Sequence, residues 1–324
     1  MIRRFASLFA LAALLLVPAS AAAAGTPKAE VEIPAKAPKA TVKIEVEGLH
    51  GGSAQIWDKI PVSGTVTPYV PGQKVEVTFY LNGHRLVARN VVVSKGSGDT
   101  GTFSDSVILR KDGKYAVSAH HKANRDLGGD TTVRKSWRVS FPSLHPGECG
   151  QAVKGFKAEL AAMGYASGGG SCFNGRLGRE VLAYRKVNDM NRSRQAGAAL
   201  VKSVYAGRGG FNLKYPDAGE HAEVSISKQV LVLAKDGKPF AIYPVSTGKS
   251  STPTITGHYS IYRLEPGTNS HGMYYSDYWH NGYAVHGYAE VPNYPASHGC
   301  VRTFIADQPR IYEQLHLGES IFVY

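Results

Sequence analysis

Residues 221–245 read HAEVSISKQVLVLAKDGKPFAIYPV, and this stretch indicates how the C-terminal part of the chain folds. The apolar run 230–233 leads into Asp236 and Gly237, and apolar residues return over 240–245. An Asp-Gly pair between two apolar runs is typical of the tight turn of a β-hairpin. The stretch therefore predicts two antiparallel strands and, around them, a β-rich domain.

The remainder of 220–324 continues this pattern. Short apolar segments predict further strands near residues 257–262, 284–286 and 320–324. Only residues 306–315 have a helical pattern, which opens near Asp307.

Residues 41–141 alternate apolar and polar side chains, for example at Val42, Ile44 and Val46, and turn pairs such as Asn82-Gly83 separate the runs. Strands at this spacing, without helical patterns, predict a β-sandwich of about 100 residues. In architecture alone it resembles the immunoglobulin-like domains of bacterial surface proteins. The interpretation is a spacer or adhesion module.

Residues 146–209 change to a helical pattern, with apolar residues at helical spacing from Val153 to Met163 and a stop at Gly164. The segments LAAMGY (160–165), FNGRL (173–177) and VLAYRK (181–186) resemble the small peptidoglycan-binding domain found beside many wall enzymes. Tyr184 and Arg185 replace the usual Phe and Gln. An ordinary helical linker domain is the alternative.

The first 24 residues have the organisation of a secretory signal peptide. Arg3 and Arg4 precede an apolar stretch over 5–17, and small residues fill 18–24. This pattern predicts export to the cell wall or envelope, with an uncleaved membrane anchor as the alternative. Residues 25–40, rich in Pro, Ala and Lys, indicate an extended linker.

The composition favours a folded, mainly β protein. The chain has 324 residues, 43% of them apolar, and 36 glycines and 18 tyrosines stand beside 4 methionines. Disorder throughout and a polytopic membrane protein are both excluded. The formal charge is +12. Without an RNA-binding or zinc-finger pattern, nucleic acid is not the expected partner, and a polyanionic envelope surface explains this charge equally well.

Three cysteines in an exported chain leave one without a partner. Cys149 and Cys172 flank a short helical pattern, and a disulfide between them would stabilise the fold by about 3 kcal/mol in the chain-entropy model. Cys300 would then be a free thiol in an oxidising compartment, where a free thiol is more often functional than idle.

Cys300 lies in the sequence SHGCVR (297–302), and His286 lies upstream in AVHG (284–287), at the end of a predicted strand. An imidazole within hydrogen-bond reach activates a thiol as a nucleophile. Gly299 permits a tight turn that directs successive backbone N–H groups at one point, as acyl transfer requires. A zinc site is the alternative, from His271, His280, His286 and His298, but their spacing is not typical of one.

The segment from His286-Gly287 to SHGCVR (297–302) resembles the signature of L,D-transpeptidase catalytic domains, and the resemblance extends over about 220–324. It implies that Cys300 is the nucleophile and His286 the proton acceptor and donor. The second nitrogen of His286 would be held by the backbone carbonyl of Gly287. Backbone amides of His298, Gly299 and Cys300 would form the oxyanion hole.

The resemblance also suggests substrate-binding residues, namely Arg302, Tyr274, Tyr275, Trp279 and Ser297. Arg302 would position a substrate carboxylate or brace the loop. The three aromatic residues would form a lid over the donor stem peptide, with packing in the core as the alternative.

The reaction implied is acyl transfer from a tetrapeptide stem of peptidoglycan, with release of D-Ala, to an amine. The product would be a 3→3 cross-link or another amine attached to the wall. With water as acceptor, the protein would be an L,D-carboxypeptidase, and a wall-binding protein with an inactive catalytic domain is a further alternative. The expected partners are the stem peptides and glycan, no metal or organic cofactor is implied, and carbapenems are the expected inhibitors.

Overall fold

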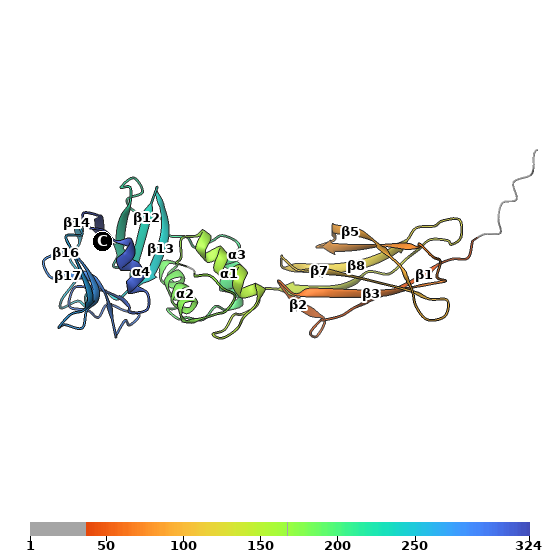
Figure 1. Cartoon of the computed structure of the whole chain (residues 1–324), viewed down its shortest axis with the longest axis horizontal. Coiled ribbons are helices and arrows are strands. Elements are labelled where there is room, and N and C mark those ends of the chain that lie inside the picture. The colour runs from red at the N-terminus through yellow and green to blue at the C-terminus, as the bar shows by residue number, and fades with distance from the viewer. Residues whose placement is uncertain (1–36, 167) are drawn as a thin grey trace, which may run out of the picture.

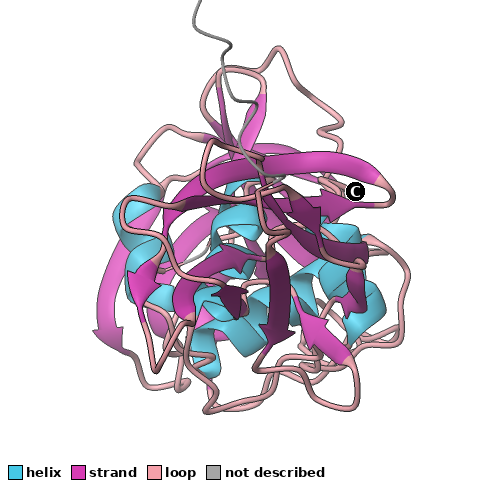
Figure 2. Ribbon diagram, turned by 90° about the vertical axis from the view of Figure 1, so that its right-hand side faces the viewer, coloured by secondary structure: helices cyan, strands magenta, loops and turns pink. Residues whose placement is uncertain are grey.

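The computed structural model describes residues 37–166 and 168–324, and it is mainly β, as the sequence predicts. The predicted signal peptide and most of the predicted linker lie outside these residues. The described chain is elongated, with a β-sandwich at one end, three helices in the middle and two further sheets at the other end (Figure 1). Figure 2 looks along the long axis from the sandwich end.

The sandwich consists of two facing sheets. Its strands are β1 (Thr41–Val46), β2 (Ser53–Gln55), β3 (Lys59–Thr67), β4 (Lys74–Leu81), β5 (His84–Val92), β6 (Ser94–Lys95), β7 (Gly101–Ile108), β8 (Gly113–His121), β9 (Asp130–Thr131) and β10 (Lys135–Ser140). One sheet has the order β1-β3-β7-β6, and the other β2-β10-β8-β4-β5 with β9 beside β8. The fully buried core between them is drawn only from residues 40–139, so the sandwich has a core of its own.

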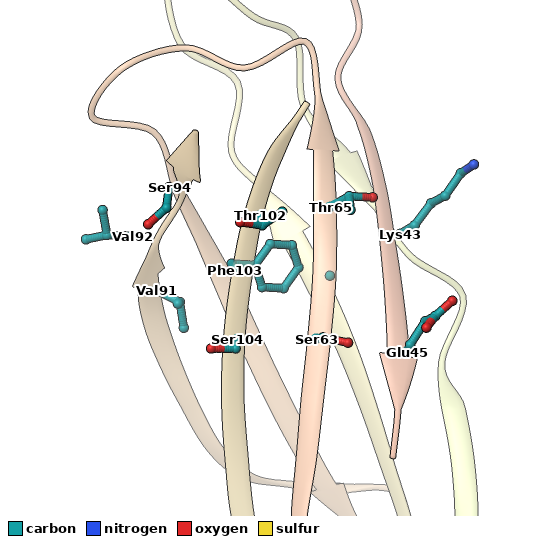
Figure 3. Close-up of a pocket in the computed structure, with 11 residues that line it drawn as sticks. Lys43, Glu45, Ser63, Thr65, Val91, Val92, Ser94, Thr102, Phe103 and Ser104 are labelled. Carbon is teal, nitrogen blue, oxygen red and sulfur yellow. The ribbon is translucent and has the colours of Figure 1, made fainter. Parts of the chain in front are cut away.

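A hollow of about 580 Å³ lies on the first of these sheets (Figure 3). Short hydroxyl side chains, among them Ser63, Thr65 and Thr102, line it, with Lys43 and Glu45 at one edge. The lining side chains do not pair a nucleophile with a base.

Three helices follow the sandwich and form, with their connections, the helical region (residues 144–209). They are α1 (Gln151–Ala162), α2 (Gly175–Val187) and α3 (Ala198–Tyr205). The first two agree with the apolar periodicity, whereas α3 was not anticipated. The side chain of Asn174 accepts a hydrogen bond from the Leu177 amide and caps α2. A disulfide joins Cys149 and Cys172 in front of α1 and α2.

The C-terminal part has two sheets and one short helix. Its elements are β11 (His221–Ser225), β12 (Val230–Lys235), β13 (Lys238–Pro244), β14 (Gly257–Ser260), β15 (Arg263–Thr268), β16 (Tyr274–His280), β17 (Tyr283–Tyr288), β18 (Val301–Phe304), α4 (Gln308–Gln314) and β19 (Ser320–Val323). The sheet orders are β13-β12-β11-β19-β14 and β15-β16-β17-β18. The hairpin predicted from residues 221–245 is present as β12 and β13, and a core of mainly aliphatic side chains, with Tyr243 and Trp279 among them, joins both sheets.

The helical region packs directly on the hairpin of the C-terminal part. Val230, Val232 and Ile242 lie in the same buried cluster as the apolar faces of α1, α2 and α3. At the end of α1, Gly164 has φ +85°, and a Cβ there would lie 2.5 Å from the carbonyl oxygen of Pro239. The helices and the C-terminal sheets therefore share one core.

An ion pair adds a second link between the helices and the C-terminal part. Arg179 of α2 binds Asp307, the residue before α4, through two hydrogen bonds of 2.5 and 2.6 Å, and both side chains are nearly buried.

The sandwich contacts the helical region through a smaller set of groups. The indole N–H of Trp57 donates to the hydroxyl of Tyr205 at 2.8 Å, and Lys202 forms an exposed ion pair with Asp112. Phe141, which follows the sandwich, packs against the Tyr205 ring. In residues 37–166 and 168–324, no helix combines the length and apolar character of a membrane span.

Candidate active site

His286 lies in the middle of β17, and its side chain is almost fully buried. Its Nδ1 is 3.0 Å from the carbonyl oxygen of Gly287. A carbonyl accepts only, so Nδ1 carries the proton and Nε2 is the unprotonated nitrogen of the neutral ring. The backbone thus fixes the tautomer that a general base needs.

Cys300 directly precedes β18, which runs parallel to β17. Val285 and Val301 are paired in this register, and both lie in the core between the sheets. Because neighbouring strand residues point to opposite faces, His286 and Cys300 both point away from that core. Packing of Cys300 on Ala284, the other neighbour of Val285, is consistent with this orientation. The structure therefore brings the two predicted residues to one face of adjacent strands.

The segment between β17 and β18, residues 289–300, is called here the Cys300 loop. The Ser297 hydroxyl donates to the carbonyl of Cys300 at 2.5 Å and accepts from the amide of Gly299 at 3.0 Å. Thr254 donates to the carbonyl of Gly299 at 2.8 Å. These bonds hold the turn that carries the thiol.

Gly299 is required at this turn. Its φ is +122°, and a Cβ would lie 2.4 Å from the Tyr283 ring. Any side chain would have to displace Tyr283, which lies in β17 three residues before His286. The glycine therefore permits the close approach of the Cys300 loop to the strand that carries His286.

The bonds within the loop correct two expectations. The amide of Gly299 is already used by Ser297, so it is not a free oxyanion donor. Within the part of the chain that the structure describes, the amides of His298 and Cys300 have no acceptor. Ser297 is buried, with its hydroxyl used inside the loop, so it is a loop-bracing residue rather than a substrate contact.

Burial sets the protonation states of the pair. It lowers the pKa of His286 to about 4, against the raising effect of the Gly287 carbonyl, and nearby Arg302 lowers it further. Burial also raises the pKa of the Cys300 thiol above its ordinary value, which the Ala284 backbone and Arg302 partly offset. At neutral pH, both groups are therefore uncharged, and the thiol donates to the carbonyl of Gly282 at 3.6 Å. In the resting state, Cys300 is therefore a protonated thiol rather than a thiolate.

Arg302 lies near this pair, and Lys249 contacts His298 of the Cys300 loop. The guanidinium of Arg302 lies over the Tyr288 ring at 4.1 Å, and the Lys249 ammonium is 3.3 Å from Nε2 of His298. Among residues 37–166 and 168–324, no carboxylate lies within ion-pair distance of Lys249 or Arg302. The surroundings of Cys300 are thus suited to an acidic ligand. Lys249 was not singled out from the sequence, because it lies 51 positions before Cys300.

The predicted aromatic lid is wrong for Trp279, which is 3% exposed and belongs to the core between the sheets. It is also wrong for the two tyrosines. The ring of Tyr274 lies 3.1 Å from the point where a Gly287 Cβ would be, and Tyr275 packs on Tyr312 of α4. Because Gly287 and His286 point to opposite faces, these rings lie behind the sheet. The alternative of packing in the core therefore holds for Trp279, whereas Tyr274 and Tyr275 are half-buried and pack on each other and on Tyr312.

Met273 and Tyr278, which the sequence did not single out, pack with Ala284 and Cys300. The Tyr278 hydroxyl donates to Glu265 at 2.6 Å, which fixes its ring. These residues therefore form the apolar wall beside the thiol. A motif search misses them because they come from another strand and its preceding loop.

Asp277 of β16 is a buried carboxyl group, and it pairs with Val285 of β17, the strand that carries His286. It faces α4 and accepts a hydrogen bond from Gln308 at 2.9 Å. Burial raises the pKa of Asp277 to about 8. Lying on the opposite face from His286, it is not a third member of the catalytic group. In the described residues, no three His, Cys, Asp or Glu side chains come together in a metal-binding arrangement.

Comparison with known proteins agrees with this geometry. Residues 219–323 match the YkuD family, the L,D-transpeptidase catalytic domain. A solved L,D-transpeptidase from Xylanimonas cellulosilytica is 24% identical, with a TM-score of 0.52, and the match covers 56% of this chain and 98% of that one. Since 56% of 324 residues is about 180, this shared fold extends beyond the catalytic domain. Comparison with curated proteins gave no match.

A second L,D-transpeptidase structure, from Stackebrandtia nassauensis, is 21% identical with a TM-score of 0.36, over 56% of this chain and 94% of that one. Cys300 and His286 lie on one face of the sheet formed by β15 to β18, within the residues that match the YkuD family. The C-terminal part of the chain belongs to the L,D-transpeptidase (YkuD) family of catalytic domains.

Proposed function

We propose that the protein is a peptidoglycan L,D-transpeptidase with Cys300 as its nucleophile. The observation that carries this proposal is the His286–Gly287 hydrogen bond, which leaves Nε2 free as a base on the face that also presents Cys300. The family of the domain supports the same reaction.

In the proposed first step, the Cys300 sulfur turns from Gly282 toward His286 and attacks the amide carbonyl of a stem tetrapeptide. Nε2 of His286 takes the thiol proton as the carbon–sulfur bond forms, because neither group is charged at rest. The carbonyl oxygen becomes an oxyanion that the free amides of His298 and Cys300 stabilise. The carbon–nitrogen bond then breaks, and D-Ala leaves with the proton from His286.

In the second step, an amine of another stem attacks the thioester, and His286 accepts its proton. The carbon–sulfur bond breaks, and the proton returns to the sulfur. An amine acceptor gives a cross-link or an attached group, whereas water gives a carboxypeptidase. Lys249 and Arg302 would favour an acidic stem, since neither has a carboxylate partner among the described residues.

The proposed place of action is the cell envelope. The disulfide between Cys149 and Cys172 suits an oxidising compartment, in line with the predicted signal peptide. We also propose that the helical region or the sandwich contributes wall binding or spacing.

The test incubates the purified chain with a disaccharide-tetrapeptide and identifies the products by mass. Wild type should release D-Ala, and Cys300→Ala and His286→Gln should each reduce release by roughly 10⁴-fold or more. A carbapenem should leave a covalent adduct on Cys300 that is indifferent to EDTA. D-Ala release by Cys300→Ala at the wild-type rate would refute the proposal.

A further inference from the structure

Lys186, near the end of α2, is a buried lysine with no acidic partner. It is 2% exposed, and its ammonium donates to the backbone carbonyl of Val245 at 2.7 Å and to that of Gln229 at 3.2 Å. In residues 37–166 and 168–324, no carboxylate lies within ion-pair distance of it. Burying an unpaired ammonium is unfavourable, and an apolar side chain would fill the site at lower cost. Stability alone therefore does not account for this residue.

One carbonyl belongs to Gln229, directly before β12, and the other to Val245, directly after β13. The side chain of Gln229 forms a clamp on Thr247. The Gln229 side chain donates to the hydroxyl of Thr247 at 2.5 Å and accepts from the amide of Thr247 at 3.0 Å. Gln229, Thr247 and Lys186 are all almost fully buried. Lys186 thus fixes the backbone from which this clamp reaches Thr247.

Thr247 in turn holds the Cys300 loop. Its carbonyl accepts from the amides of Ala296 and Ser297 at 2.8 and 2.9 Å. Ser297 then binds the carbonyl of Cys300 and the amide of Gly299. A continuous series of hydrogen bonds therefore runs from the helical region to the nucleophile.

We propose that Lys186 is a positioning residue, through which the helical region holds the Cys300 loop in the geometry that acyl transfer needs. Only the expected effect of Lys186 on the rate of acylation rests on the proposed function. Lys186 does not touch the substrate. It acts through Gln229 and Thr247 on the direction of the His298 and Cys300 amides.

Lys157 provides a matched control. It is also a buried lysine on a helix, α1, and it donates to a backbone carbonyl, that of Gly169, at 2.7 Å. Its partner lies in the loop before Cys172, with no connection to the Cys300 loop. Lys157→Met removes the same kind of group as Lys186→Met without breaking the series.

The experiment compares Lys186→Met and Lys157→Met with wild type in the full chain. Hydrogen exchange of residues 294–302, followed by mass spectrometry, should be faster in Lys186→Met and unchanged in Lys157→Met. Acylation of Cys300 by meropenem should slow by about tenfold or more in Lys186→Met, because small displacements of oxyanion donors are costly. Alkylation by iodoacetamide, which needs no oxyanion hole, should change less than about twofold in either variant.

Thr247→Val tests the same series if Lys186→Met does not fold. It removes the hydroxyl that Gln229 binds and should also slow acylation, and the double variant should be no slower than the slower single one. Unchanged exchange in Lys186→Met, an equal loss in Lys157→Met, or wild-type acylation by Thr247→Val would overturn the proposal. If wild type forms no adduct, the proposed function fails, and the exchange data still decide the role of Lys186.

Discussion

The sandwich and the helical region both precede the catalytic domain in the chain, yet they are attached to it differently. The sandwich closes its own core and touches the helices through exposed or half-buried groups such as Trp57 and Lys202. The helices instead complete a core with Val230 and Ile242 of the catalytic hairpin. The sequence pattern changes near residue 146 and again near residue 220. Only the change near 146 marks a boundary between two hydrophobic cores, because the helices and the catalytic hairpin share one core.

The largest test of this difference is truncation. A chain of residues 142–324 should fold and form a carbapenem adduct at the full-length rate, because the sandwich core is left out as a unit. A chain of 210–324 should not fold, since it exposes the apolar face of the hairpin and loses the contacts of Arg179 and Lys186. Thermal unfolding and intact-protein mass measure both. A folded 210–324 fragment with full reactivity would show that the helices are an accessory.

The second test removes one buried charge from the helices and C-terminal sheets, which share one core. Arg179→Met leaves Asp307 buried without its cation, and the free energy of unfolding should fall by about 3–5 kcal/mol. The double change Arg179→Met with Asp307→Leu should recover much of that loss, because no unpaired charge remains. Urea unfolding monitored on residues 142–324 gives the values. If the single change costs less than about 1 kcal/mol, the pair does not hold helix and sheet together.

The third test compares how the stabilities of residues 142–324 and of the sandwich depend on acid pH. The pKa of His286 is lowered from 6.5 to about 4, so the folded state binds its proton less readily than the unfolded state. The His286 contribution to stability is therefore present above pH 6.5 and is lost as pH falls toward 4. It amounts to about 3 kcal/mol. The unfolding of 142–324 should show this loss, and the sandwich alone should not.

His286→Gln is the control for this pH dependence. Asp277, whose pKa burial raises to about 8, works in the opposite direction, stabilising the fold at lower pH. Only the difference between wild type and His286→Gln therefore isolates the histidine. If that difference stays constant between pH 7 and 4, the imidazole is not held neutral by burial.

Much of this site is local in sequence, and that part was predictable. The hairpin follows from the turn at Asp236 and Gly237, and Cys149 and Cys172 were expected to pair because they flank a short helical pattern. The Cys300 motif and the upstream His286 fall on adjacent strands because a short loop joins their ends. Each of these features depends on the types of residues that lie close together in the sequence.

The rest depends on contacts between distant segments. Trp279 looked like a lid residue, but its strand faces the second sheet, a fact set by sheet order rather than by the residues around it. Lys186 was not singled out from the sequence, because it is buried only by the packing of α2 on the hairpin. The residue type of Gly299 is compatible with an oxyanion hole. Its amide is nevertheless used by the Ser297 hydroxyl, and that hydrogen bond depends on the side-chain rotamer of Ser297, which the sequence does not reveal.

The smallest expected effect concerns the ion pair between Lys202 and Asp112, at the junction of the sandwich and the helices. Both side chains are largely exposed, at 62% and 40%, and such pairs contribute about 0–1 kcal/mol, less at high salt. Lys202→Ala should therefore leave the unfolding of both units and the acylation of Cys300 within error of wild type. Tyr205→Phe, which removes the acceptor of the partly buried Trp57 N–H, should cost about 1 kcal/mol at the same junction. If Lys202→Ala destabilised the catalytic unit as much as Arg179→Met does, the two regions would be attached alike. The contrast between a separable sandwich and a fused helical region would then be lost.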